Sequence, residues 1–349
     1  MKRNVTIHDV AQAAGVSGGT VHNALYGKKG VSDAVRKNIL RISEELGYKP
    51  NMVASALKRK PRKIIVSFPE PKGDNRYYFT YLWKGYRGFQ EELLSYNIEA
   101  IEVPYNDTRE KSFTAGIMQV LRQFDNQIDG IITGGRFFED ALATLKYMEK
   151  RHIPIVLVSE EATNINCLSC IQSNHTTDGR LAAELLSSQL RGKEKILICA
   201  GDMLLPSNRL NAEGFEAYLK ENQCSCGLVE IYGVDVYSQI VSCLKTDPDI
   251  KGLYSVNARC SLLLARAVEE LGLAGQVRLV GTDLFPESAE YMQKGVICNI
   301  IHKGVEHHAR QGMRILLNYL AKNEEPEQSY YLDKSIVIFR SNLQEYFKG

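Results

Sequence analysis

Four hydroxyl side chains near the start of the chain stand where they could bind phosphate oxygens. Thr6, Ser17 and Ser32 each directly precede a group of residues with helical spacing, and Thr20 follows Ser17 within one helical turn. The first amides of a helix have no partner inside it, so a helix N-terminus with a hydroxyl beside it attracts anions. Contacts of this type position a protein on nucleic acid without reading its sequence. The same hydroxyls can also act simply as helix caps.

Two polar side chains between these hydroxyls, His22 and Asn23, could contact base edges. An Asn side chain suits the N6 and N7 atoms of adenine. Gly18 and Gly19 precede them, and each glycine in the first turn of a helix costs about 1 kcal/mol relative to Ala. Either the backbone approaches the nucleic acid closely there, or these two positions no longer read bases.

The elements that must position these side chains are three short helices. Gly15 ends the first helix, and the turn at residues 14–17 has the right length to hold two helices at the steep angle of a helix-turn-helix. Residues 18–25 then form the helix that enters the major groove. The apolar residues with helical spacing fall in three groups, which are Ile7, Val10, Ala11 and Ala14; Val21, Ala24 and Leu25; and Val35, Ile39, Ile42 and Leu46.

The positive charge of the chain is concentrated in this segment. The net charge is only +2, but residues 1–63 carry 13 Lys and Arg against 4 Asp and Glu, whereas the other 286 residues carry 30 against 37. A basic domain attached to a mildly acidic body favours a polyanionic partner for the basic part. A solvated basic surface is the alternative.

An ordered series of motifs runs from residue 5 to residue 51: Val5-Thr6-Ile7-His8-Asp9-Val10-Ala11, Ala14-Gly15-Val16-Ser17, Thr20-Val21, Gly27, Val31-Ser32, Arg36 and Glu44-Glu45-Leu46-Gly47-Tyr48-Lys49-Pro50-Asn51. This series closely resembles the N-terminal domain of the lactose repressor (LacI/GalR) family of transcription regulators. The resemblance implies a DNA-binding helix-turn-helix. The chain departs from the family at Gly18 and Gly19, where larger side chains are common, and at Asn23, where Arg is frequent.

The segment after Pro50 resembles the hinge of the same family. A helix of its length is marginal in water on its own, and in the family it folds only on the operator, where leucines from two subunits enter the minor groove and kink the duplex. The resemblance places Leu57 as this wedge. Asn51 and Ala54 belong to the same Pro-Asn-x-x-Ala-x-x-Leu motif, and small residues such as Ala54 let two helices approach closely. A flexible basic linker with an incidental leucine is the alternative.

From residue 64 the chain alternates short apolar runs with amphipathic segments, which predicts parallel α/β structure with binding residues at the carboxyl ends of strands. The expected strands are Ile64–Phe68, Ile98–Val103, Gly130–Thr133, Ile155–Val158, Lys195–Cys199, Val229–Tyr232, Gly252–Tyr254, Val277–Val280, Cys298–Ile301 and Ile336–Phe339.

The resemblance continues to Phe339-Arg340-Ser341-Asn342 and implies a two-lobed body like that of periplasmic binding proteins. The expected fold is α/β, with a three-helix DNA-binding head at 1–49, a hinge helix and linker at 50–63, and an effector-binding and dimerisation body at 64–349. Parallel sheets flanked by helices make up its two lobes. We expect lobe one in about 64–160 plus 299–325, and lobe two in about 161–298 plus 326–342.

Candidate effector contacts stand near the ends of the expected strands. The resemblance implies that Asp283 accepts hydrogen bonds from ligand hydroxyls and that Asn257 lines the pocket, although Ala258 replaces a usual Asp. Tyr78, in the run Tyr77-Tyr78-Phe79, could stack on a sugar-like ring, or this run could pack the lobes together. Helix capping or turn formation is the alternative for the Asp and Asn positions. The remaining candidates by resemblance are Ser159, Asn174, Asn211, Lys303 and, as a replacement for an Arg missing at Asn211, Arg209.

Metal, redox and enzymatic chemistry lack their sequence signatures. Cys167-x-x-Cys170 and Cys224-x-Cys226 have neither the second pair nor the His spacing of a zinc site, and His307-His308 point to different sides of a helix. No P-loop, Gly-x-Ser-x-Gly or dinucleotide fingerprint occurs. We therefore expect reduced cysteines, no metal, no cofactor and no enzymatic activity.

The sequence thus predicts a homodimeric transcription regulator, a repressor, that binds double-stranded operator DNA. A small polar effector, a sugar or sugar derivative, is expected between the lobes. Because no apolar run could span a membrane and the N-terminus lacks an apolar signal block, we expect a soluble, cytoplasmic, nucleoid-associated protein with no membrane partner. The alternatives are a free solute-binding protein and a sugar-processing enzyme of related fold.

Overall fold

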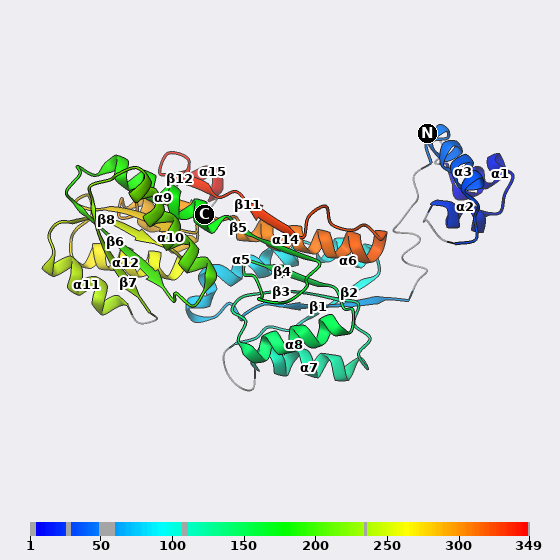
Figure 1. Cartoon of the computed structure of the whole chain (residues 1–349), viewed down its shortest axis with the longest axis horizontal. Coiled ribbons are helices and arrows are strands. Elements are labelled where there is room, and N and C mark those ends of the chain that lie inside the picture. The colour runs from blue at the N-terminus through cyan, green and yellow to red at the C-terminus, as the bar shows by residue number, and fades with distance from the viewer. Residues whose placement is uncertain (1–4, 26–28, 49–59, 107–110, 234–235, 348–349) are drawn as a thin grey trace. The chain divides into compact units, whose positions relative to one another are not determined.

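A computed structural model describes residues 5–25, 29–48, 60–106, 111–233 and 236–347. The chain divides into two compact units, Met1–Lys60 and Pro61–Gly349, which are described separately below (Figure 1).

The N-terminal unit is a bundle of three helices, α1 (Ile7–Ala14), α2 (Gly18–Leu25) and α3 (Asp33–Glu45). These helices confirm the predicted helix-turn-helix, and α2 has the predicted bounds. Gly15 ends α1 in the left-handed conformation, with a φ of 66°. Each helix contributes two buried residues to one small apolar core, which contains Val10, Ala11, Val21, Ala24, Ile39 and Ile42.

The C-terminal unit contains two six-stranded sheets, which we call lobe one and lobe two with their covering helices. Lobe one has the strand order β11-β5-β4-β3-β1-β2, and its pairings are parallel. These strands are β1 (Arg62–Ser67), β2 (Ile98–Glu102), β3 (Gly130–Gly134), β4 (Ile155–Val158), β5 (Ser169–Ser173) and β11 (Tyr330–Asp333).

Lobe two has the strand order β12-β10-β9-β8-β6-β7. Its edge strand β12 runs antiparallel to β10, and the other pairings are parallel. These strands are β6 (Lys195–Gly201), β7 (Gly227–Tyr232), β8 (Ile250–Ser255), β9 (Arg278–Thr282), β10 (Asn299–His302) and β12 (Ile336–Phe339).

Helices cover both faces of each sheet, so each lobe has two apolar cores (Figure 1). Lobe one carries α5 (Arg76–Arg87), α6 (Gln90–Ser95), α7 (Phe113–Gln123), α8 (Glu139–Lys150) and α14 (Val305–Leu317). Lobe two carries α9 (His175–Gln189), α10 (Pro206–Glu221), α11 (Tyr237–Thr246), α12 (Ala258–Glu270) and α13 (Pro286–Gln293). Shorter turns are η1 (Gly73–Asn75), η3 (Asn318–Lys322) and α15 (Leu343–Tyr346). Within the described ranges, no helix combines the length and apolar character that crossing a membrane requires.

The strand pairing differs from the expected lobe boundaries in three places. β5 pairs with β4, and β11 pairs with β5, so both belong to lobe one, not lobe two; β10 pairs with β9 in lobe two, not in lobe one. β5 and β11 were not predicted, because Ser169–Ser173 and Tyr330–Asp333 are short and rich in polar atoms. The apolar centre of β10 indicates a buried strand but not which sheet receives it.

Candidate functional site

The hydroxyl side chains of the N-terminal unit cap its helices and remain exposed. Thr6 forms a capping box with Asp9, whose carboxylate accepts the Thr6 amide at 2.7 Å. The Ser17 hydroxyl accepts the Thr20 amide at 3.1 Å, and Ser32 accepts the Val35 amide. Thr6, Ser17 and Ser32 are exposed, so capping leaves their outer surface open to an anion.

The first two residues of α2 are glycines, and nothing within the described part of the N-terminal unit requires a glycine at either position. Gly18 and Gly19 do not have left-handed backbones; a Cβ on Gly18 would meet nothing within 4 Å, and one on Gly19 would meet only the Ser17 hydroxyl, at 3.6 Å. Thr20, His22 and Asn23 are half-buried along the same helix. An alanine would therefore fit at either glycine within this unit.

Arg36 holds the end of α2 in place, a role that the sequence analysis did not assign. Its Nη1 donates to the backbone oxygens of Ala24 at 2.8 Å and Asn23 at 3.3 Å, at the end of α2. A cation at a helix C-terminus stabilises it. The sequence motif contained Arg36, but its partner atoms are backbone groups that no motif identifies. The hinge candidates Asn51, Ala54 and Leu57 lie outside the described residues.

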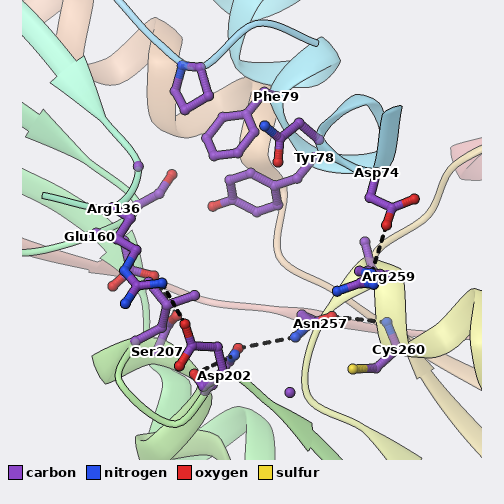
Figure 2. Close-up of a pocket in the computed structure, with 18 of the residues that line it drawn as sticks. Asp74, Tyr78, Phe79, Arg136, Glu160, Asp202, Ser207, Asn257, Arg259 and Cys260 are labelled. Carbon is purple, nitrogen blue, oxygen red and sulfur yellow. Dashed lines mark hydrogen bonds and ion pairs between the residues drawn. The ribbon is translucent and has the colours of Figure 1, made fainter. Parts of the chain in front are cut away.

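A cavity of about 290 Å³ lies between the two lobes (Figure 2). Its walls come from segments that follow the carboxyl ends of the parallel strands and from the first turns of α5, α9, α10 and α12, as expected for a ligand site of this architecture. Tyr78 and Phe79 project from α5 into the cavity (Figure 2). Five predicted effector contacts line it: Tyr78, Ser159, Asn257, Asp283 and Lys303.

Three other predicted contacts do not line this cavity. Asn174 caps α9 by accepting the Thr177 amide at 3.0 Å. Arg209 is more than half exposed and lies near Glu213 on the same helix. Asn211 is fully buried, where it donates to the Ser207 carbonyl at 2.7 Å and accepts the Tyr254 hydroxyl at 3.0 Å. The family resemblance placed these residues near the site, but Asn174 is engaged as a helix cap, and the rotation of α10 turns Arg209 and Asn211 to other faces.

Asp283 presents an unpartnered carboxylate to the cavity. Its side chain is 4% exposed, and neither carboxylate oxygen has a hydrogen-bond partner in the described parts of the chain. Its backbone is held from both sides: its amide donates to Ile301 at 2.9 Å and its carbonyl accepts the Ser288 hydroxyl at 3.1 Å, with a φ of 65°. A buried carboxylate without partners is costly, and both oxygens of this one are available to a hydrogen-bond donor in the cavity.

Asn257 is both a helix cap and a cavity wall. Its Oδ1 accepts the Cys260 amide at 2.9 Å, which caps α12, and its Nδ2 donates to Asn208 at 3.3 Å. Asn208 in turn donates to the Asp202 carbonyl at 3.0 Å. Gly201 permits this arrangement because a Cβ there would lie 2.8 Å from Nδ2 of Asn257.

Polar contacts between the lobes surround the cavity, and sequence reasoning missed them. Arg136 of lobe one pairs with Asp202 of lobe two at 2.6 Å, and Arg259 of lobe two pairs with Asp74 of lobe one at 2.7 Å. Figure 2 shows these pairs on opposite sides of the cavity. Glu160 of lobe one accepts the hydroxyl of Ser207 of lobe two. No sequence signal links these partners, because each pair joins separate sheets.

Burial sets the charge states of groups in and around the cavity. It raises the pKa of Glu160 to about 6, although the Ser207 hydrogen bond and the Lys303 charge lower it. It lowers the pKa of His175 to about 3, and Lys303 contributes to this shift. The imidazole is therefore neutral near pH 7. Lys303 is 5% exposed, and its ammonium donates to the Val256 carbonyl at 3.2 Å.

Comparison with known proteins gives two family matches. Residues 65–324 match a periplasmic binding protein domain, and residues 6–51 match the lacI family of bacterial regulatory proteins.

Curated relatives include the HTH-type transcriptional regulator pepR1 of Lactobacillus delbrueckii subsp. lactis, which is 28% identical over 68% of this chain and 66% of that protein. Catabolite control protein A of Streptococcus mutans is 28% identical over 62% of this chain and 61% of that protein. The chain thus matches less than two thirds of the length of each of these relatives.

Solved structures share the fold of the C-terminal unit. A protein from Bacteroides fragilis described as a LacI transcriptional regulator has a TM-score of 0.74 at 17% identity, covering 82% of this chain and 100% of that one. A solute-binding protein from Bacillus halodurans with bound myo-inositol has a TM-score of 0.70 at 17% identity, covering 82% of this chain and 96% of that one.

Proposed function

The chain belongs to the periplasmic binding protein domain family and carries an N-terminal domain of the lacI family, and from this premise we propose that it is a transcriptional regulator, a repressor, controlled by a small polar effector. The observation that carries the proposal is that one chain combines a helix-turn-helix with an interlobe cavity containing an unpartnered carboxylate. A free solute-binding protein or a sugar-processing enzyme does not need the helix-turn-helix.

In the proposed DNA contact, α2 enters the major groove and the exposed caps of α1, α2 and α3 lie on phosphates. The open space at Gly18 and Gly19 supports a close approach of the α2 backbone to DNA. Thr20, His22 and Asn23 then stand closest to the base edges. Two copies of the chain bind the two halves of one operator, each with its hinge segment and Leu57 at the minor groove. This function places the protein with the chromosome in the cytoplasm.

In the proposed effector site, a sugar or sugar derivative lies between the lobes. Tyr78 and Phe79 supply apolar ring faces, while Asp283, Asn257, Ser159 and Lys303 supply hydrogen-bonding groups. Both lobes contribute, so a ligand that contacts both favours the closed arrangement. The ligand can change the affinity for DNA only if it binds the closed and open states with different affinities, and the size of the change is limited by that difference.

A first prediction concerns the α2 face. Gly19→Glu adds a negative charge at an exposed helix N-terminus, where it favours the helix but repels phosphate. We expect the variant to keep its fold and ligand binding and to lose binding to a duplex that the parent protein selects from a random pool. Parent binding should also fall by roughly 10³-fold from about 50 to 200 mM salt if about six phosphates are contacted. Retained binding by Gly19→Glu, or affinity independent of salt, would contradict the proposed interface.

A second prediction concerns closure. Arg136→Ala and Asp202→Ala should each weaken effector binding, and the double variant should weaken it by less than the sum of the two. Because both side chains are partly exposed, we expect a coupling energy of only about 1 kcal/mol. Calorimetric titration of the four proteins measures it. Additive effects would show that this pair does not hold the closed state.

A further inference from the structure

The charged groups around Tyr78 are predominantly negative. Burial raises the pKa of the Tyr78 hydroxyl, and the nearby carboxylates of Asp283, Glu160 and Asp178 raise it further. Three carboxylates thus lie near the Tyr78 hydroxyl. Asp283 and Glu160 line the cavity, whereas Asp178 is 1% exposed and does not line it.

Few cations in the described structure balance these carboxylates. The positive charge of Lys303 lowers the pKa of both Glu160 and Asp178. However, the Lys303 ammonium forms no ion pair with a carboxylate of the described residues, because none lies within 4.0 Å of it. Arg136 and Arg259 are already paired with Asp202 and Asp74.

The neighbouring histidines add no charge near pH 7. Burial lowers the pKa of His175 and of His308 to about 3 and lowers that of His302 as well. The Nδ1 atom of His302 accepts the Leu284 amide, which also requires an unprotonated nitrogen. The carboxylates of Asp283, Glu160 and Asp178 are therefore balanced only by the ammonium of Lys303 among the described residues near them.

The unpartnered oxygens in the cavity belong to opposite lobes. Glu160, from lobe one, uses one oxygen for Ser207, and its buried Oε2 has no hydrogen-bond partner in the described ranges. Asp283, from lobe two, has both oxygens unpartnered. An ammonium offers three donors and no acceptor. An ammonium on the ligand would satisfy Glu160, ligand hydroxyls would donate to Asp283, and the ligand would thereby link the lobes.

We propose that the effector is an amino sugar, or a polyol of similar size with a protonated amine, whose ammonium binds Glu160 and whose hydroxyls bind Asp283. This inference rests on the proposed effector site. The cavity volume of about 290 Å³ suits one sugar ring. A neutral sugar leaves the excess negative charge uncompensated, and a sugar acid adds to it. Such a ligand also favours closure, since Glu160 and Asp283 belong to different lobes.

The test uses the full chain and calorimetric titration with D-glucosamine, D-galactosamine and D-mannosamine. Each is compared with its parent hexose and its neutral N-acetyl derivative, and D-glucuronate and D-galacturonate serve as acids. At least one amine should bind at least about tenfold more tightly than its neutral counterparts. Glu160→Gln should remove this preference. The matched control Glu161→Gln changes an exposed neighbour that does not line the cavity and should keep the preference.

Equal or tighter binding of a parent hexose or an acid would overturn the inference, as would a lack of binding by all three amines or a preference that survives Glu160→Gln. The proposed function is judged separately, on binding of the selected duplex and its change with ligand. A hexose that binds more tightly and alters DNA binding would overturn the charge inference alone. An amine that binds through Glu160 without altering DNA binding would support the inference and contradict the regulatory function.

Discussion

Asp283→Asn should make the ligand-free protein more stable and should abolish its response to the effector. The carboxylate is buried without hydrogen-bond partners in the described structure, and an amide of the same shape removes the charge. We expect a gain in the free energy of unfolding of about 1 kcal/mol, because the amide removes the cost of burying a charge but leaves its own polar atoms unpartnered. The amide offers only one acceptor oxygen and turns a donor toward the donors of the ligand. Stability and function therefore change in opposite directions, as at many binding sites.

Asn is the appropriate replacement because of the backbone. Asp283 has a φ of 65°, a left-handed conformation that Asn adopts readily and Ala does not. Asp125→Asn is the matched control, since Asp125 also has a left-handed backbone, with a φ of 49°, but an exposed side chain. Urea unfolding and titration of the effector measure the two effects. A destabilised Asp283→Asn protein, or one that binds the effector with unchanged affinity, would contradict the role given to this carboxylate.

Local signals in the sequence identify the N-terminal unit well. The caps Thr6, Ser17 and Ser32 and the closing Gly15 each act within a few residues of their own position, and the structure bears out all four. In the C-terminal unit the apolar strands are similarly recognisable, and β4 and β12 have the predicted bounds. β5 and β11 are short and rich in polar residues, and β11 pairs with β5, which lies far from it in the sequence, so their own residues carry little signal.

The cavity was predictable mainly where a strand end fixes the direction of a side chain. Asp283 and Ser159 follow β9 and β4 directly, and both line the cavity. Asn211 lies inside a helix, where a small rotation decides between cavity and core, and it is in the core. The pairs around Arg136 and Arg259 depend on how two separate sheets face each other, which no local pattern encodes.

The close contact of α9 and α10 gives a prediction in which local and tertiary effects have opposite signs. A Cβ on Gly214 of α10 would lie 2.2 Å from the carbonyl oxygen of Thr176, and one on Gly179 of α9 would lie 1.9 Å from that of Asn211. Helix propensity alone predicts that Gly214→Ala stabilises the protein by about 1 kcal/mol. The packing predicts that Gly214→Ala destabilises the protein. The added Cβ would clash with a backbone oxygen, which cannot move aside as a side chain can, so the two helices must separate.

We therefore expect Gly214→Ala to lower the free energy of unfolding by about 3 kcal/mol, at the upper end of the usual cost of overpacking. Separation of the helices should also weaken effector binding, since His175 begins α9, and Ser207 and Asn208 lie in the first turn of α10, where all three line the cavity. Glu213→Ala, at an exposed site on the same helix, is the control and should change stability by no more than about 0.5 kcal/mol. Urea unfolding measures whether Gly214→Ala raises or lowers the free energy of unfolding. A more stable Gly214→Ala protein would mean that α9 and α10 do not hold the cavity walls through this contact.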